Sequence, residues 1–303
     1  MPSNRTGRWA RVVLLLLFCP ALLAAQPQHD RAFWQAIAKN KYAVPEHESA
    51  DALSQELSAM LASPDPELRD ELSYSILVRW IYRLNILSTQ QLIALTDEWR
   101  ANLKSGLGEV GTNSVLKRSF SALCLSLMAN REAKAPFMGA ERYHQLVAES
   151  AAYLQAERDL RGYDTKLHWI HSTAHTADLL AALADSPLLT KKEKSAILGA
   201  IAARLASAHE VYTQGEQDRL AAAVVAVIRR SDFDLAAFEP WLNGIHDEDR
   251  EVWTATTPES LARFQNHNYL LQALTVRLAL ESDSPRIAGC KQKVLAILKT
   301  RLD

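Results

Sequence analysis

The stretch RGYDTKLHWIHSTAHTADLLAALAD, residues 161–185, decides how the rest of the chain is interpreted, because it holds three of the nine histidines within eight residues. From Leu167 to Ala184 it has no Lys, Arg or Glu, and Asp178 is its only acid. A helix that is apolar nearly all round is normally interior, and polar groups on it must find hydrogen-bond partners or border a cavity. The stretch therefore predicts a buried helix beside a polar cleft.

The polar side chains of this segment recur at helical spacing. At about 100° per residue, four of them fall within roughly 80° of one another. These four are His168, His171, His175 and Asp178. His171 and His175 are four positions apart, a spacing at which two imidazoles can hold one divalent metal ion, with Asp178 as a third ligand. In a metal-free site, one histidine would bind a ligand or act as general base while Asp178 orients it.

A structural role for these side chains is a third interpretation, since buried histidines often serve only as hydrogen-bond ties. The pattern also departs from known metal enzymes. Ser172 follows His171 where a zinc protease has Glu, and no adjacent His-Asp pair marks a metal-dependent phosphohydrolase. No Ser or Cys stands in a nucleophile motif. His171, His175 and Asp178 are thus catalytic candidates without a reaction, and a divalent metal ion is the one candidate cofactor.

The charged turn ERDLRGYD leads into the histidine segment. Arg161 in this turn is a candidate for clamping a ligand at the mouth of the cleft. The simpler interpretation is that Asp164 or Thr165 caps the helix while Arg161 pairs with Asp159.

Two later segments are expected to face the same cleft. GEQDRL contributes Glu216 and Arg219 at the start of a helix, where acids also suit the helix dipole. RFQNHNYLL contributes Asn266, and because Asn is a poor helix former, its side chain is expected to be hydrogen-bonded. HDEDRE, which begins at His246, is interpreted as a solvated loop.

Composition favours an all-α fold. With only 10 Gly and 11 Pro in 303 residues, the chain has few turn signals for strands and few breakers for helices. Amphipathic periodicity predicts helices at 32–40, 49–61, 66–87, 90–104, 115–130, 140–157, 167–184, 191–208, 216–230, 235–242, 258–280 and 287–302.

Small-rich apolar runs recur at Ser121, Thr176, Leu220 and Leu270, which is 55, 44 and 50 residues apart. Such spacing is close to two helices and their turns, and it is typical of an armadillo- or HEAT-like array of helical hairpins. Because the period is irregular, an irregular α-bundle remains the alternative. No change in composition divides residues 26–303, which are predicted to form a single domain.

The N-terminus has the form of a secretory signal peptide. Residues 1–25 combine three arginines, a short apolar run broken by Pro20, and small residues at Ala24 and Ala25. The run is too short to span a membrane. Cys19 is a candidate for lipid attachment, although its neighbours suit that processing poorly. Cleavage near Ala25 would place the mature protein in the periplasm or outside the cell, with no membrane span.

Charge and cysteine content narrow the function further. The whole chain carries −1, and loss of the three leader arginines leaves the mature chain near −4. This mild acidity disfavours nucleic acid as a partner, since such binding depends on a basic surface. Cys124, within the apolar run SALCLSLMA, and Cys290 are expected to be two separate free thiols.

Three segments in order carry a resemblance to a known family. They are ERDLRGYDTKLHWIHSTAHTADLL, GEQDRLA and RFQNHNYLLQAL. Together they resemble the family of the domain of unknown function 2785, over about Leu57 to Leu280. The resemblance implies an α-helical fold with no assigned activity. It picks out Trp169, His171, His175, Asp178, Glu216 and Arg219, and covers His168 less securely.

The sequence thus predicts an exported helical protein whose inner helix presents His171, His175 and Asp178 to a cleft for a small ligand or a divalent metal ion. Candidate ligand-binding residues around it are Trp169, Arg161, Glu216, Arg219 and Asn266. The alternative is a non-enzymatic scaffold that holds another protein on a helical surface, with the histidines as internal ties.

Overall fold

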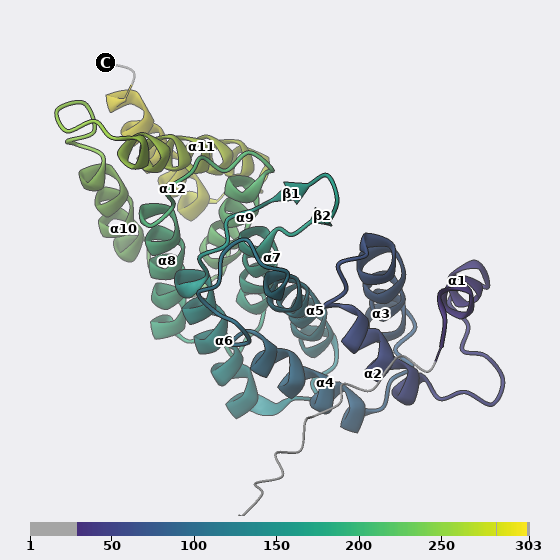
Figure 1. Cartoon of the computed structure of the whole chain (residues 1–303). Coiled ribbons are helices and arrows are strands. Elements are labelled where there is room, and N and C mark those ends of the chain that lie inside the picture. Colours follow the sequence, from purple (N-terminus) through teal and green to yellow (C-terminus); the bar gives the residue numbers. More distant parts are fainter. Residues whose placement is uncertain (1–28, 283, 302–303) are drawn as a thin grey trace, which may run out of the picture.

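The computed structural model describes residues 29–282 and 284–301, and over these residues the protein is all-α, as predicted (Figure 1). Its only sheet in this part of the chain is a pair of two-residue strands. The predicted signal peptide, residues 1–25, lies outside the described residues. No helix within them is long and apolar enough to cross a membrane.

The elements follow the predicted order closely, apart from two π-helical segments and the start of the histidine helix. In chain order they are α1 Arg31–Lys39, α2 Ala50–Met60, π-helix η1 Glu67–Tyr74, α3 Ser75–Val78, π-helix η2 Arg79–Arg83, α4 Thr89–Asn102, α5 Ser114–Lys134, α6 Gly139–Ala156, β1 Tyr163–Asp164, β2 His168–Trp169, α7 Ser172–Ala184, α8 Lys191–Ala206, α9 Glu216–Ile228, α10 Leu235–Glu248, α11 Pro258–Leu280 and α12 Pro285–Thr300.

Local sequence explains most of the helix starts. Ser88 caps α4 by accepting a hydrogen bond from Gln91 N at 3.1 Å. Thr190 caps α8 and exchanges hydrogen bonds with Glu193, and Pro258 occupies the first turn of α11. Each device satisfies an N–H group that has no partner inside the helix, or removes the need for one.

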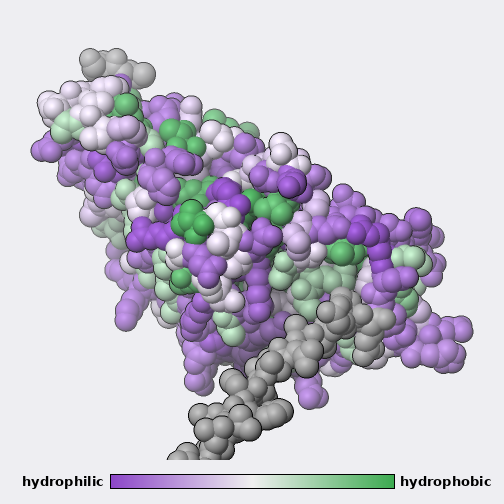
Figure 2. Space-filling model, viewed as in Figure 1, coloured by the Kyte–Doolittle hydropathy of each residue, from purple (hydrophilic) through white to green (hydrophobic). Residues whose placement is uncertain are grey.

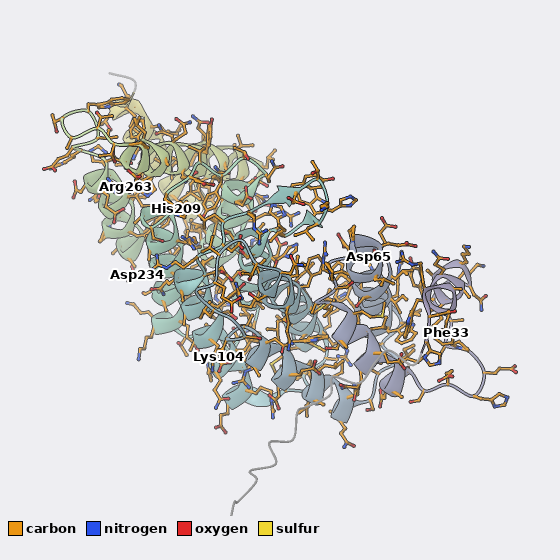
Figure 3. The ribbon with its side chains drawn as sticks, in the orientation of Figure 1. Phe33, Asp65, Lys104, His209, Asp234 and Arg263 are labelled. Atoms are coloured by element: carbon orange, nitrogen blue, oxygen red, sulfur yellow. The ribbon has the colours of Figure 1, made fainter. Side chains whose placement is uncertain are left out.

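The helices form two layers that follow the chain from one end of the molecule to the other (Figure 1). α5, α7, α9 and α11 pack side by side in that order, and α6, α8, α10 and α12 pack along them. Phe33 and Asp65 lie toward the N-terminal end, and Arg263 lies toward the opposite end (Figure 3). The face drawn in Figure 2 is mainly hydrophilic with separate hydrophobic patches, as expected when apolar residues fill the space between layers.

α7 is the interior helix that the sequence predicts. It packs between α5 and α9 and also against α6, and its apolar residues are buried except Ala181, which is partly exposed. Cys124 on α5 and Cys290 on α12 are separate, buried, free thiols, as predicted. Burial raises the pKa of both, which keeps them in the thiol form.

The predicted start of this helix at Leu167 is wrong, because α7 begins at Ser172. Residues 163–164 pair with 168–169 as an antiparallel hairpin. Asp164 Oδ1 accepts hydrogen bonds from Lys166 N and Leu167 N, both at 2.8 Å, so it stabilises the hairpin turn. The prediction that Asp164 or Thr165 caps α7 is therefore also wrong. His168 lies in β2, off the helix.

The segment from His246 is solvated as predicted at Asp247, Glu248, Arg250 and Glu251, but it is not wholly a loop. α10 continues to Glu248, and Asp249 is buried. Its carboxylate accepts hydrogen bonds from His267 Nδ1 at 2.9 Å and from an Arg301 nitrogen at 2.6 Å. Buried charges are kept only when they are paired in this way, so Asp249 joins the end of α10 to α11 and α12.

A buried ion pair joins α5 to the end of α6. The Arg118 guanidinium, which is fully buried, donates to both oxygens of Glu157 at 2.7 and 3.1 Å. Glu157 also accepts a hydrogen bond from the Tyr153 hydroxyl at 2.9 Å. Breaking a buried pair leaves an uncompensated charge, which costs far more than losing an exposed pair.

Glu157→Gln should therefore lower the free energy of unfolding by about 3–5 kcal/mol, because Arg118 would stay buried without its counter-charge. Urea denaturation measures this. The matched control is Asp218→Asn, which breaks the largely exposed pair with Arg277 and should cost less than about 1 kcal/mol. Equal losses in the two variants would contradict the prediction.

Candidate functional site

A cleft of about 400 Å³ opens where η1, β2 and the loop before α9 meet the first turns of α7 and α9. Its walls are mainly polar or aromatic. They comprise Asp70, Tyr74, Leu123, Trp169, His171, His175, Asp178, Gln214 and Arg219. The structure thus brings together five residues that the sequence singled out, namely Trp169, His171, His175, Asp178 and Arg219.

His175 lies on α7 and is almost completely buried. Its Nδ1 lies 2.8 Å from Ser119 Oγ, and Ser119 Oγ also hydrogen-bonds to the carbonyl oxygen of Ile170. A carbonyl can only accept, so the single hydroxyl proton of Ser119 goes to Ile170. Ser119 Oγ must then accept a hydrogen bond from His175, which places the ring proton on Nδ1.

This tautomer leaves His175 Nε2 without a proton. The atom has no hydrogen-bond partner within the described residues. It is not sealed from solvent either, and because His175 lines the cleft, Nε2 contacts the cleft. Burial, followed by the nearby His171 and Arg219, lowers the pKa of His175 well below its ordinary value. His175 therefore remains neutral at neutral pH and offers a free lone pair.

His171 is held differently, in the turn just before α7. Its backbone is left-handed, with φ 53°, and its carbonyl accepts the hydrogen bond from His175 N at 2.9 Å that starts the helix. Its Nε2 donates to the carbonyl of Gln214 at 3.1 Å and lies 3.4 Å from the Glu216 carboxylate. The two imidazole rings are 5.7 Å apart between centroids. They face one cleft although only His175 is on the helix.

Glu216 acts on the cleft through His171 and does not line it. Its other oxygen accepts from Gln214 N at 2.9 Å, and its side chain is 2 % exposed. Gly162 makes this arrangement possible, because a Cβ atom there would come within 2.6 Å of both Gln214 and Glu216. The chain next to Gly162 also anchors the turn, since Arg161 O accepts from His171 N at 3.1 Å.

Asp178 is paired with Arg219 across α7 and α9. One guanidinium nitrogen lies 2.8 and 2.6 Å from the two carboxylate oxygens. Burial raises the pKa of Asp178, and Arg219 opposes that shift without cancelling it. In the other direction, Asp178 raises the pKa of Arg219. The pair is thus a partly desolvated wall of the cleft, and the serine, not Asp178, orients His175.

Sequence reasoning missed Asp70 and Tyr74, which reach the cleft from η1. Within the described residues the Asp70 carboxylate has no hydrogen-bond or ion-pair partner, and burial raises its pKa. Burial also raises the pKa of Tyr74 well above its ordinary range, so Tyr74 stays a phenol and can donate a hydrogen bond. Both residues were assigned to an ordinary amphipathic helix. Their spacing of four was the available signal, but nothing in the sequence marks the π-helical turns, which often occur at functional sites.

Trp169 projects from the hairpin beside the cleft and is 39 % exposed. Its indole stacks on the His171 ring at 4.9 Å between centroids and meets the edge of Tyr163 at 5.0 Å. Arg69, which is buried next to Asp70, donates to the carbonyls of Leu167 and Trp169 and so fastens the hairpin to η1. The cleft therefore has a fixed aromatic rim.

Besides Glu216, two predicted ligand-binding residues lie apart from the lining of the cleft. Arg161 donates to Asp159 through two nitrogens, at 2.6 and 2.9 Å, which matches the simpler interpretation of this turn. Asn266 is fully buried and bonds to Tyr212 N at 2.9 Å and to Glu210 O at 2.9 Å. Its side chain is hydrogen-bonded, as its position in a helix predicts, and it joins α11 to the loop before α9.

The donor set does not suit a metal ion. Over residues 29–282 and 284–301, no three His, Cys, Asp or Glu side chains converge as a metal site requires. Both oxygens of Asp178 already face Arg219, and His171 Nε2 already has a carbonyl partner. His175 Nε2 is the one free histidine acceptor that we identify in the cleft.

Comparison with known proteins tests the resemblance seen in the sequence. Neither the curated proteins nor the solved structures contain a match. One family model matches residues 103–276, more than half of the chain and within the predicted span of 57–280. The match includes His171, His175, Asp178 and Arg219, whereas Asp70 and Tyr74 precede it. The chain therefore belongs to the family described as Protein of unknown function (DUF2785).

Proposed function

We propose that the cleft binds a small polar ligand without a metal ion, and that the ligand donates a hydrogen bond to His175 Nε2. The observation that carries this proposal is the bare, cleft-facing Nε2 of a buried imidazole whose other nitrogen is fixed by Ser119. A histidine that served only as a structural tie would use both nitrogens or seal the second one. Buried polar groups without a partner cost free energy, so one that borders a cavity indicates a binding role.

The other cleft residues define the chemistry of the ligand. Asp70 supplies a carboxyl group without a partner, Tyr74 supplies a phenol, and Gln214 supplies an amide. The charges on Asp178 and Arg219 offset each other. The cleft therefore has no surplus positive charge for a multiply charged anion, and it suits an uncharged molecule rich in hydroxyl or amide groups.

The same arrangement would support general acid–base catalysis on such a ligand. His175 is neutral at neutral pH and would accept a proton at Nε2. The Asp70 carboxyl, whose pKa burial raises, is a second titratable group in the same cleft that would exchange a proton with the ligand. Groups whose environments shift their pKa values in this way are typical of acid–base sites. In this proposal His171 positions Trp169 and the turn and does not touch the reacting atoms.

We further propose that the protein works outside the cytoplasm, in the periplasm or beyond. The support is the basic, apolar and small-residue order of residues 1–25. The two remaining cysteines are buried and far from reactive, so neither depends on a reducing compartment.

Chemical modification tests whether His175 presents an accessible base. Diethyl pyrocarbonate reacts with unprotonated imidazole nitrogens, and His175 should be modified even at about pH 6 because its lowered pKa keeps it neutral. Peptide mapping by mass spectrometry locates the modified residue. The internal control is His267, whose Nε2 is buried, has no hydrogen-bond partner and should stay unmodified.

The same reagent then tests ligand binding. Polar uncharged metabolites that raise the melting temperature of the wild type should slow modification of His175. They should lose their effect in His175→Asn, which keeps a donor for Ser119 but removes the cleft-facing nitrogen. His144→Asn is the matched control, because that Nδ1 bonds Glu193 away from the cleft. The proposal fails if His175 is as unreactive as His267, or if no compound protects it.

Asp70→Asn should stabilise the protein, because a partly buried carboxylate without a hydrogen-bond or ion-pair partner is costlier than a neutral amide. The folded-state pKa of Asp70 is raised, so the wild type loses stability as the pH rises through that value. The gain in melting temperature should be absent near pH 4 and reach about 1–3 °C at neutral pH.

Asp65→Asn is the opposite-sign control for this measurement. Arg31 lowers the pKa of Asp65, so its removal should destabilise the protein at neutral pH, with a smaller loss in acid. A fall in the melting temperature of Asp70→Asn at neutral pH would show that Asp70 serves a structural role.

N-terminal sequencing of protein from extracytoplasmic fractions tests export. The expected first residue is at or near Gln26, since cleavage is predicted near Ala25. Protein that keeps Met1 and remains with the cytoplasmic fraction would refute the proposed location.

A further inference from the structure

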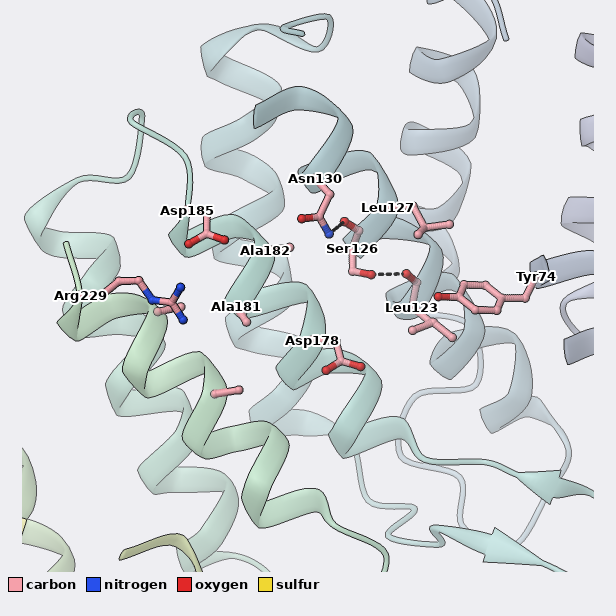
Figure 4. A pocket seen from close by; sticks show the side chains of 12 residues that line it. Tyr74, Leu123, Ser126, Leu127, Asn130, Asp178, Ala181, Ala182, Asp185 and Arg229 are labelled. Carbon is pink, nitrogen blue, oxygen red and sulfur yellow. Dashed lines mark hydrogen bonds between the residues drawn. The ribbon is translucent and has the colours of Figure 1, made fainter. Parts of the chain in front are cut away.

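A second hollow of about 360 Å³ lies between α5, α7 and α9 (Figure 4). It shares Tyr74, Leu123 and Asp178 with the cleft, so the two spaces adjoin at these side chains. Three neighbouring helices line it with residues at helical spacing. The lining residues are Ser126, Leu127 and Asn130 of α5, Ala181 and Ala182 of α7 with its C-cap Asp185, and Ala222 and Ala226 of α9 with its C-cap Arg229.

The combined groove is longer than a small molecule needs. His175 and Asp185 are ten residues apart along α7, which corresponds to about 15 Å. Each hollow alone is within the size range of a small-ligand pocket, at about 400 and 360 Å³. A ligand that fills both must therefore be an elongated molecule of several units.

The far end of the groove carries polar groups that are still available. Within the described residues, the Asp185 carboxylate and the Arg229 guanidinium make no hydrogen bond, and Arg229 only lies 3.6 Å from Glu281 in an ion pair. Asn130 donates to Ser126 O at 2.8 Å, which leaves its own carbonyl oxygen free. Figure 4 shows Asp185, Arg229 and Asn130 around this end of the hollow, with Asp178 toward the cleft.

Between these polar ends the lining includes four alanine side chains, which form an apolar stretch. A suitable ligand alternates hydrogen-bonding edges with apolar faces. Linked sugar rings have this character, since their hydroxyl groups project from the ring edges while the C–H groups form the faces. Trp169 adds an exposed aromatic surface at the cleft end, on which such a face can pack.

Charge and backbone geometry disfavour other chain-like ligands. The groove has the acids Asp70, Asp178 and Asp185 against Arg219 and Arg229, so it has no surplus of positive charge to hold a polyanion. An extended peptide would need unpaired main-chain partners, which the helices lining the groove do not offer.

We propose that the groove binds a neutral linear oligosaccharide, which extends from Trp169 past His175 and Asp178 to Asp185 and Arg229. This inference rests on the proposed function, because the first sugar unit is the ligand that contacts His175. It adds the chemical class of the ligand and the direction in which the oligosaccharide lies along the groove.

Isothermal titration calorimetry with length series tests the inference. The probes are linear oligomers of glucose and of N-acetylglucosamine, from one to six units. Affinity for at least one series should rise by about tenfold or more from the monomer to the tetramer and then level off, because further units lie outside the groove. Binding should also protect His175 from diethyl pyrocarbonate.

Ala222→Phe should separate the two halves of the groove. Ala222 lies on α9 in the second hollow and is only half-buried, so a phenyl ring there fills space that the oligosaccharide would occupy. The affinity for the tetramer should fall to that for the dimer, whose affinity should not change. Ala196→Phe, on the exposed side of α8, is the matched control and should leave all lengths unaffected. Melting temperatures confirm that both variants fold.

Three results would overturn the inference. They are no binding in any series, an affinity that does not depend on length, and tetramer binding that Ala222→Phe leaves unchanged. If single polar compounds still protect His175 in those cases, the oligosaccharide inference is wrong while the proposed function stands. If His175 is unreactive and nothing protects it, the proposed function fails as well.

Discussion

The cleft depends on the close approach of Gly162 to the loop that precedes α9. A side chain at this position would overlap Gln214 and Glu216, and both would have to move away from His171. The contact places a carbonyl and a carboxylate against one imidazole nitrogen, which stabilises the left-handed turn at His171. Because that turn starts α7, it also sets where His175 and Asp178 emerge along the helix. The main-chain path thus comes first, and the positions of the cleft side chains follow from it.

The two histidines have different roles because different neighbours bond their ring nitrogens. The Nε2 proton of His171 is bonded to the Gln214 carbonyl beside the Glu216 carboxylate, so His171 supports Trp169 and the turn. His175 has its Nδ1 proton committed to a serine, and its second nitrogen remains free. Burial lowers the pKa of His175 and raises those of Asp70 and Asp178. All three shifts favour neutral forms, and burial is the largest cause of each.

Sequence reasoning reached the central helix, the all-α class and the family, because apolar periodicity and ordered motifs express them directly. It also placed His171, His175, Asp178 and Arg219 together. It failed at the start of α7, since residues 167–170 fit a helical period as well as a short strand, and only pairing with 163–164 decides between them. It failed at Asp70, because η1 looks like an amphipathic α-helix in sequence. Asp249 was also missed, since its burial depends on His267 and Arg301, which are distant in the chain.

The π-helical form of η1 has a consequence for how this protein can diverge from its relatives. A π-turn accommodates one more residue than an α-turn, so it behaves as an insertion absorbed inside a helix. Loss of one residue between Glu67 and Tyr74 would restore an α-helix in this segment. It would also rotate one part of the helix relative to the other by about 100°, which would exchange the side chains that face the cleft. Evolution could in this way change the guest by single-codon deletions while the histidines stay in place.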